Sequence, residues 1–131
     1  MHEQRELLEN AKVIAVVGHS DKAHRTSYQI AEFLRQVGYT VYAVNPTIQE
    51  IRGEKCYATL ADIPEPIDIV NVFRRSQYLP GVVEDAIELG AKAVWAQSGV
   101  QHSDAVARAE SAEMLLVMDT CIKVAYRRLI P

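Results

Sequence analysis

The sequence predicts an α/β fold in which helices cover both faces of a five-stranded parallel sheet. Short apolar runs alternate along the chain with segments whose apolar residues recur at helical spacing. Several of these runs, such as V-I-A-V-V, are apolar at every position, which is typical of strands buried on both faces. No linker or shift in composition divides the 131 residues, so we expect one domain over residues 1–131.

The amino-terminal part of the chain contains two predicted helices and two predicted strands. A charged segment with two leucines predicts a short helix over residues 3–10, and the apolar run after it predicts a strand over residues 12–17. Apolar residues at helical spacing predict a helix over residues 27–37, which Gly38 ends. The run T-V-Y-A-V-N-P then predicts a second strand that stops at its Asn-Pro pair.

The rest of the chain continues this alternation after one irregular stretch. Residues 47–66 contain a glycine and two prolines, and we expect little regular structure there beyond one helical turn at residues 60–63. The elements predicted after this stretch are a strand over residues 67–73, a helix from near Pro80 to Gly90, a strand over 91–97, a helix over 102–112, a strand over 113–119 and a helix over 120–129.

The order of the strands follows from how parallel strands are connected. Crossovers between parallel strands are right-handed, which limits the arrangements that the chain can adopt. We expect the five strands in the order 3-2-1-4-5, the Rossmann-like doubly wound arrangement. Ligands of such sheets bind outside the carboxyl ends of the strands, where the order reverses. The expected crevice therefore lies at the carboxyl ends of predicted strands 1, 2 and 4.

Composition argues against several classes of function. The net charge is −3, so the chain has no basic excess with which to hold nucleic acid. No apolar run approaches the ~20 residues of a membrane helix, and the charged amino terminus has no apolar signal core, so we expect a cytoplasmic protein with no membrane partner. The two cysteines lie far apart and the four histidines are scattered, so we expect no metal site.

The turn after the first strand reads G-H-S-D-K-A-H-R-T-S and leads into a helix. In this fold the turn faces the crevice, and the unpaired N–H groups at the start of the helix form an anion site. Gly18 permits close approach of the backbone to a ligand. The hydroxyl groups and cations that follow it are those of Ser20, Lys22, Arg25, Thr26 and Ser27. We therefore favour a phosphate site here over a plain surface loop.

Two common phosphate-binding motifs do not fit this turn. A nicotinamide cofactor usually requires G-x-G-x-x-G and an acid after the second strand, whereas this turn has one glycine and the strand ends in Asn45-Pro46. A P-loop requires G-K-[ST], which does not occur in the sequence. An NAD(P)-binding, oxidoreductase-like protein is the alternative that we keep open.

A series of motifs runs through most of the chain. In order they are V-V-G-H-S, R-T-S-Y, A-V-N-P, G-E-K-C-Y, L-A-D-I-P-E-P-I-D-I-V-N-V-F-R-R, G-A-K-A-V-W-A-Q-S-G and V-M-D-T-C-I-K. Together they resemble the small stand-alone CoA-binding proteins, which are similar to the amino-terminal CoA-binding domain of the succinyl-CoA synthetase alpha subunit. The resemblance covers residues 12–129, and P-x-D-x-V-x-x-F-R-R and M-D-x-C-I-K are its most specific parts.

The resemblance implies a Rossmann-like domain that binds coenzyme A or an acyl-CoA. It implies phosphate contacts from the first turn and nucleotide contacts after strands 2 and 3. The residues that it places against CoA are Gly18, His19, Ser20, Lys22, Arg25, Asn45, Pro46, Phe73, Arg74 and Arg75. The family turn more often reads G-A-S, so His19 is a departure from the family pattern.

The charge of CoA agrees with this set of residues. CoA carries a pyrophosphate and a ribose 3′-phosphate, so a ribose-binding acid would repel it and several cations are needed. Lys22, Arg25, Arg74 and Arg75 are candidates, and arginine binds phosphate through two parallel hydrogen bonds.

Two residues after later strands are further candidates. Gln97, followed by Ser98, ends the fourth strand, and we expect it to reach the pantetheine arm of CoA. Cys121 lies near a helix amino terminus, a position that favours the thiolate. Our hypothesis is a mixed disulfide between Cys121 and the CoA thiol under oxidation, and the alternative is a small buried apolar side chain.

No set of residues predicts catalysis. An enzyme needs a nucleophile, a base and an orienting group within reach of one another, and no such spacing stands out. The resemblance implies a phosphorylated histidine only in a second domain of the synthetase. We therefore favour a binding module without its own catalysis and keep a small acyl-CoA enzyme as the alternative. A homodimer and a separate enzyme partner are both left open.

Overall fold

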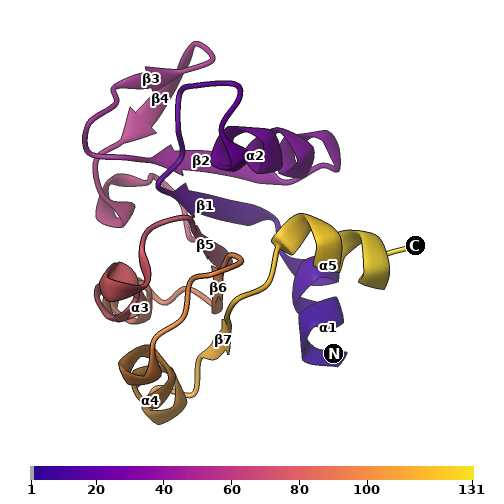
Figure 1. Ribbon diagram of the computed structural model, residues 1–131, viewed down its shortest axis with the longest axis vertical. Coiled ribbons are helices and arrows are strands. Elements are labelled where there is room, and N and C mark those ends of the chain that lie inside the picture. Colours follow the sequence, from indigo (N-terminus) through magenta and orange to yellow (C-terminus); the bar gives the residue numbers. More distant parts are fainter. Residues whose placement is uncertain (1) are drawn as a thin grey trace.

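The computed structural model describes residues 2–131 and contains one seven-stranded sheet (Figure 1). The strands are β1 (Val13–Val17), β2 (Thr40–Val44), β3 (Glu50–Ile51), β4 (Glu54–Tyr57), β5 (Ile69–Val72), β6 (Ala93–Ala96) and β7 (Leu115–Val117). They lie in the order β3-β4-β2-β1-β5-β6-β7. Every neighbouring pair is parallel except β3 with β4, which is antiparallel.

Helices cover both faces of this sheet. They are α1 (His2–Asn10), α2 (Thr26–Gln36), α3 (Leu79–Glu88), α4 (Ser103–Ser111) and α5 (Ile122–Leu129), with short 3-10 helices η1 (Leu60–Asp62) and η2 (Ser76–Tyr78). Figure 1 shows α3 and α4 on one side of the sheet and α1, α2 and α5 on the other. Among residues 2–131, no helix has the length and apolar character needed to cross a membrane.

The predicted α/β fold with helices on both faces is confirmed, but the predicted number and order of strands are wrong. The two missed strands, β3 and β4, lie within the stretch expected to be irregular. β3 has two residues and β4 reads E-K-C-Y, so neither forms an apolar run. β4 occupies the place beyond β2 that the order 3-2-1-4-5 assigns to residues 67–73, and β5 lies beside β1 instead. Without β3, the six parallel strands lie in the order β4-β2-β1-β5-β6-β7. Numbered along the chain from 1 to 6, these strands have the order 3-2-1-4-5-6.

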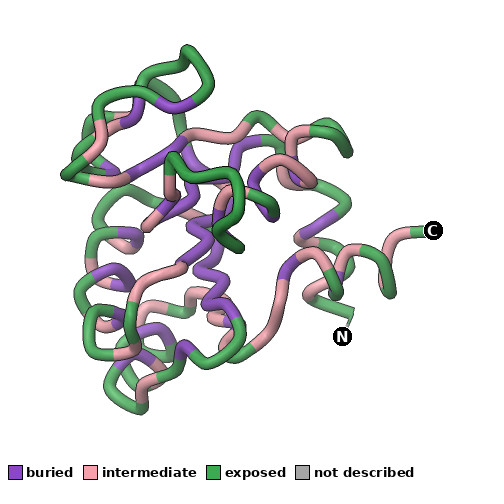
Figure 2. Tube along the Cα trace, turned by 45° about the horizontal axis from the view of Figure 1, so that its top comes forward, coloured by how far each residue is buried: buried purple, intermediate pink, exposed green. Residues whose placement is uncertain are grey.

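β1 lies at the centre of the sheet, and its side chains fill the core on both faces. Ile14 and Val16 pack with residues of α1, α2 and α5, whereas Ala15 and Val17 pack with residues of α3 and α4. Every residue of β1 is at most 7 % exposed, which explains why the strand has no polar position. Figure 2 shows the buried residues gathered in the central strands and on the inner sides of the helices.

A carboxylate fixes the start of β1. Asp68, just before β5, accepts hydrogen bonds from the backbone N–H groups of Lys12 (2.8 Å) and Val13 (2.9 Å). The ammonium group of Lys92 lies 3.6 Å from its other oxygen. Burial raises the pKa of the Asp68 carboxyl, but the two backbone hydrogen bonds and Lys92 outweigh burial, so its pKa lies below the ordinary value. Asp68 thus joins the amino ends of β1 and β5.

We predict that Asp68→Ala lowers the free energy of unfolding by about 1–3 kcal/mol at pH 7, because two backbone N–H groups lose their acceptor. A lowered carboxyl pKa means that this stabilisation is present above the unfolded-state pKa of about 4 and is lost as the pH falls through the folded-state value. Urea unfolding at pH 7, 4 and 3 should show the difference from wild type narrowing below about pH 4. The exposed Glu88→Ala is the control, with an expected change within about 0.5 kcal/mol. A difference of equal size at pH 7 and pH 3 would contradict this role of Asp68.

Candidate functional site

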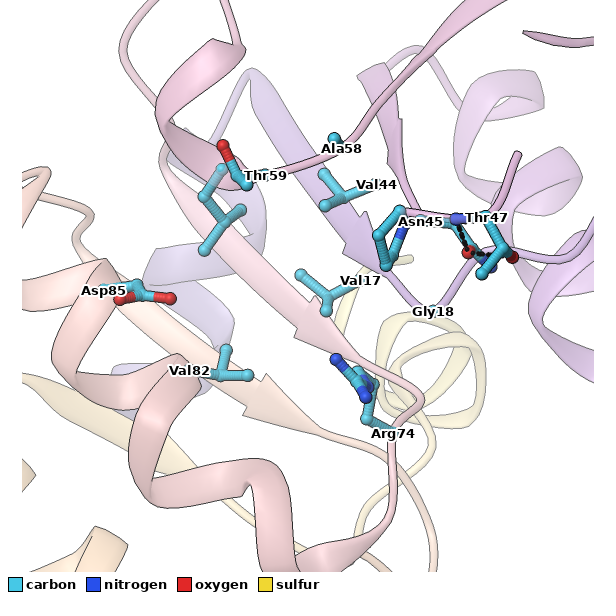
Figure 3. A pocket seen from close by; sticks show the side chains of 12 residues that line it. Val17, Gly18, Val44, Asn45, Thr47, Ala58, Thr59, Arg74, Val82 and Asp85 are labelled. Carbon is cyan, nitrogen blue, oxygen red and sulfur yellow. Dashed lines mark hydrogen bonds between the residues drawn. The ribbon is translucent and has the colours of Figure 1, made fainter. Parts of the chain in front are cut away.

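A cavity of about 390 Å³ opens where the carboxyl ends of β1, β2, β4 and β5 meet, a size typical of small-ligand pockets (Figure 3). It is lined by residues 17–18, 44–47 and 58–60 and by Arg74, Val82 and Asp85. Valine side chains form its walls at the ends of β1 and β2 and on α3. The cavity therefore combines apolar walls with polar groups at its rim.

The position of the cavity agrees with the expected crevice only in part. Predicted strands 1 and 2 do contribute, as β1 and β2. The remaining contributions come from residues 58–60, which follow the missed strand β4, from Arg74 after β5 and from two residues of α3, rather than from residues 91–97. The physical reason is the order of the strands in the sheet. β2 lies on one side of β1 and β5 lies on the other, so the strand order reverses between β1 and β5, and the crevice opens there.

Gly18 makes the turn between β1 and α2 possible. Its N–H group donates to the carbonyl of Val44 (2.9 Å), which extends the contact between β1 and β2 by one residue. Its φ of +89° is a conformation that residues with a Cβ rarely adopt. A Cβ at this position would lie 3.3 Å from Cγ of Arg74 and 3.4 Å from the backbone carbon of Phe73. The turn after β1 and the segment after β5 are therefore in close contact through this glycine.

A second hollow, a groove of about 310 Å³, lies at the amino terminus of α2. It is lined by Gly18, Ser20, Lys22, Arg25, Thr26, Ser27 and Phe73, which are the hydroxyl and cationic residues predicted for phosphate binding together with the predicted phenylalanine. Gly18 lines both the groove and the cavity, so the two hollows adjoin.

The groove is ordered by hydrogen bonds within the turn. The N–H group of Ser20 donates to Oγ of Ser27 (2.9 Å), and the N–H group of Lys22 donates to Oγ of Ser20 (3.0 Å). The side chains of Lys22 and Arg25 are exposed and form no ion pair with any other residue in the range 2–131. The groove thus presents two free cations beside the start of a helix, which is an anion-binding arrangement.

The ring of His19 points into the protein. The side chain is 0 % exposed, and its ring packs edge-on against Tyr28. Nδ1 lies 2.7 Å from the carbonyl of Ser20, so we assign the ring proton to Nδ1 and an acceptor role to Nε2. Nε2 faces the guanidinium group of Arg35 at 3.4 Å. The His19 ring therefore supports the turn from below and does not line the groove.

Asn45 links the two turns on either side of the cavity. Its Nδ2 donates to the carbonyl of His19 (3.2 Å), and its Oδ1 accepts from the N–H group (3.0 Å) and the hydroxyl group (2.8 Å) of Thr47. Pro46, the next residue, lines the cavity. The two predicted residues after β2 thus lie at the site, and Asn45 acts at least as a connector between its loops.

The three predicted residues after β5 have different surroundings. Phe73 lines the groove and Arg74 lines the cavity. The guanidinium carbon of Arg74 lies 4.1 Å from the ring centre of Tyr78, a cation–π contact that holds the side chain in place. Arg75 is exposed and lines neither hollow. The structure therefore brings Phe73 and Arg74 to the site and leaves Arg75 outside it.

Gln97 and Cys121 lie farther along the same edge of the sheet, outside the linings of both hollows. Gln97 is buried, and its Oε1 accepts from Nδ2 of Asn71 (3.0 Å) and from the N–H group of Ile122 (3.0 Å). This network leaves Oδ1 of Asn71 without a partner among the described residues. Cys121 is half-buried and precedes α5 as its N-cap residue. The polar network therefore joins β5 and β6 to the start of α5, beside Cys121.

Several lining residues were missed by the sequence analysis. Thr47, Ala58, Thr59, Leu60, Val82 and Asp85 all line the cavity. Residues 58–60 follow β4, so they could not be assigned to the site while that strand was unrecognised. Val82 and Asp85 are three residues apart on α3 and share one face of the helix. Their spacing gives no signal by itself, because only the sheet order shows that this face meets the cavity.

Among residues 2–131, no group of three or more histidine, cysteine or acidic side chains is arranged to hold a metal ion.

Comparison with known proteins identifies the family of this chain. A family model described as "CoA binding domain" matches residues 12–127. The uncharacterized protein YneT of Bacillus subtilis is 45 % identical over 124 residues, which cover 95 % of this chain and 92 % of that protein. A hypothetical protein from Pyrococcus horikoshii OT3 has the same fold, with a TM-score of 0.95 and 36 % identity over 99 % of this chain and 92 % of that one.

A larger protein contains a similar segment. An ADP-forming acetate–CoA ligase of Archaeoglobus fulgidus is 38 % identical over 74 residues, which cover 56 % of this chain but 11 % of the ligase. The chain thus matches a small part of that ligase and nearly the full length of YneT.

The buried His19 generates a test of the turn. Burial lowers the pKa of His19 below 6.5, opposed by its hydrogen bond to Ser20 and reinforced by Arg35. The stabilisation from neutral His19 is therefore fully present above about pH 6.5 and is lost as the pH falls toward the folded-state value. We predict that His19→Gln lowers the free energy of unfolding by about 1–2 kcal/mol at pH 7.5 and that its difference from wild type narrows by pH 5. Urea unfolding at both pH values measures this, with the exposed His24→Gln as a control. A difference that does not change with pH would show that His19 protonation is not coupled to folding.

Proposed function

Because this chain belongs to the CoA binding domain family, we propose that it binds coenzyme A, or an acyl-CoA, across the turn after β1 as a module without its own catalysis. One observation is the main support: Gly18 is shared by a cationic groove at a helix amino terminus and by an apolar cavity at the strand ends. A ligand that contains both phosphates and an aromatic base has the chemistry to occupy both hollows at once.

We assign the phosphates to the groove. Lys22 and Arg25 are exposed, unpaired within the described residues and adjacent to the first turn of α2. The hydroxyl groups of Ser20 and Ser27 already order the loop, so little conformational freedom is lost when an anion binds. Arg74, at the border between the two hollows, is the further cation that a third phosphate requires.

We assign the nucleoside to the cavity. Val17, Val44 and Val82 offer apolar surface for a flat base, and Asn45 and Thr47 offer polar atoms to a ribose. No acid follows β2 directly, since Asn45 occupies the place where nicotinamide-binding proteins carry the ribose-binding carboxylate. A ribose with a phosphate group is therefore favoured over a free diol, which supports CoA over NAD.

The pantetheine arm is assigned to the far end of the sheet edge. Gln97 and Cys121 lie there, beyond the two hollows, so the proposal requires an extended ligand to reach them. We further propose that bound CoA is used by a separate enzyme, because the ligase relative pairs a similar segment with much additional chain. The alternative of an NAD(P)-binding protein is tested by the calorimetry described next. The alternative of a small acyl-CoA enzyme is tested by a turnover assay with acyl-CoAs.

Calorimetry with CoA, acetyl-CoA, NAD and NADP tests the proposal. We expect CoA to bind, and its affinity should decrease when the salt concentration is raised from 50 to 500 mM. NAD and NADP should give no binding signal. Arg25→Ala and Arg74→Ala should each weaken CoA binding about tenfold or more, as expected for loss of a charge-assisted hydrogen bond. Arg128→Ala, which removes an exposed cation on α5, is the matched control and should leave the affinity unchanged. NAD binding without CoA binding would overturn the proposal, and so would the absence of a binding signal for all four ligands.

The thiol of Cys121 gives a second test. We predict that diamide, which takes up the two electrons and two protons released by two thiols, couples Cys121 to the CoA thiol. Mass spectrometry of intact protein should show the mass of one CoA less two hydrogens in wild type and in Cys56→Ser, but not in Cys121→Ser. Cys56 is buried, and burial raises the pKa of its thiol, so it should not react. An adduct absent from wild type, or retained in Cys121→Ser, would contradict the prediction.

A further inference from the structure

The two ends of the cavity carry opposite kinds of polar groups. Figure 3 shows Gly18, Arg74 and Thr47 at one end and Asp85 and Thr59 at the other, with Val17 and Val44 between them. The first end adjoins the cationic groove through Gly18. The second end contains Asp85, the one acidic residue in the cavity lining.

Asp85 is free to bind a ligand. Its side chain has no hydrogen bond or ion pair with any other residue in the range 2–131, whereas the neighbouring Glu84 is held by Arg108 of α4. Val82, one turn earlier on α3, packs into the core and lines the cavity beside it. The helix therefore presents an apolar side chain and then a carboxylate to the same cavity end.

This end of the cavity accepts hydrogen bonds and does not donate them through its side chains. A carboxylate is an acceptor only. The hydroxyl group of Thr59 donates its single hydrogen to Asp62 (3.0 Å). Toward a ligand, the oxygen of this hydroxyl group can therefore only accept a hydrogen bond. Val82 adds apolar surface beside Asp85.

We propose that Asp85 is a specificity residue that selects adenine by accepting a hydrogen bond from its exocyclic 6-amino group. The inference rests on the proposed binding of CoA and assigns the base end of that site. On the N7 side of the base, adenine offers the carboxylate its 6-amino donor, whereas hypoxanthine and guanine offer only the acceptors N7 and O6, because their N1–H group points to the other side. Such an unpaired contact between acceptors is the kind of mismatch on which base discrimination depends.

The cavity is long enough to keep an acidic residue apart from the phosphates of an anionic ligand. Asp85 lies at the end opposite to Gly18, so a base held there keeps its phosphates at the cationic end. A ligand in the reversed orientation would bring its phosphates against the carboxylate, which like-charge repulsion disfavours. Asp85 therefore recognises the base and also determines the orientation of the nucleotide in the cavity.

The test compares two small nucleotides that differ in the base. Calorimetry with adenosine 3′,5′-bisphosphate and inosine 3′,5′-bisphosphate gives the ratio of affinities, which is independent of the general attraction of anions to the protein. We expect wild type to prefer the adenine compound about tenfold or more. In Asp85→Asn the side-chain amide can turn to donate to the 6-oxo group, so the preference should fall to about threefold or less.

A matched control separates base recognition from net charge. Glu88→Gln makes the same change of charge on the same helix but lies outside the cavity lining, so it should keep the wild-type preference. Asp85→Ala, which removes the acceptor outright, should lose the preference as Asp85→Asn does. Both positions are exposed, so the variants are expected to fold.

CoA binding by wild type is measured alongside, so that the two proposals can fail separately. If CoA binds and the adenine preference is unchanged in Asp85→Asn, the role of Asp85 is overturned and the CoA module stands. If CoA does not bind to wild type, both proposals are overturned. A preference lost in Asp85→Asn and Asp85→Ala but kept in Glu88→Gln supports Asp85 as the adenine-selecting residue.

Discussion

The close contact between the turn after β1 and the segment after β5 is the constraint on which the site depends. Position 18 favours glycine, because a φ of +89° strains a residue with a Cβ and because that Cβ would lie only 3.3 Å from Cγ of Arg74 and 3.4 Å from the backbone carbon of Phe73. From this point the chain leads into α2, whose first two residues line the groove together with Gly18. The groove and the cavity share Gly18 as a wall, so one backbone position fixes how the two hollows adjoin.

The turn is held from within the protein and not by the residues that face solvent. The His19 ring lies beneath it between Ser20 and Arg35, and Asn45 connects it to the turn after β2. Lys22 and Arg25 are left without protein partners in the described part of the chain. Folding therefore supplies the order of the loop in advance, and the free cations keep their full attraction for an anion.

The fold class could be predicted from the sequence because β1, β6 and β7 are continuous apolar runs and β5 has a single polar residue, Asn71. The helices between these strands also have clear apolar faces. The sheet order could not, because it depends on a four-residue strand with two charged residues, Glu54 and Lys55. For the same reason the residues after β4 were not assigned to the site. His19 shows a different limit, since a histidine in a polar turn gives no sign of whether its ring faces solvent or the core. Asp85 could be recognised only in three dimensions, where α3 meets the cavity.

The hairpin of β3 and β4 has a consequence for how this sheet ends. An exposed strand edge is a template on which a strand of another molecule can pair. Here the outer edge is a two-residue strand, and Arg52 and Gly53 at its turn both have positive φ, which twists the hairpin. Charged side chains surround this edge, at Glu50, Arg52, Glu54 and Lys55. Growth of the sheet by addition of a second copy is thereby disfavoured at this edge.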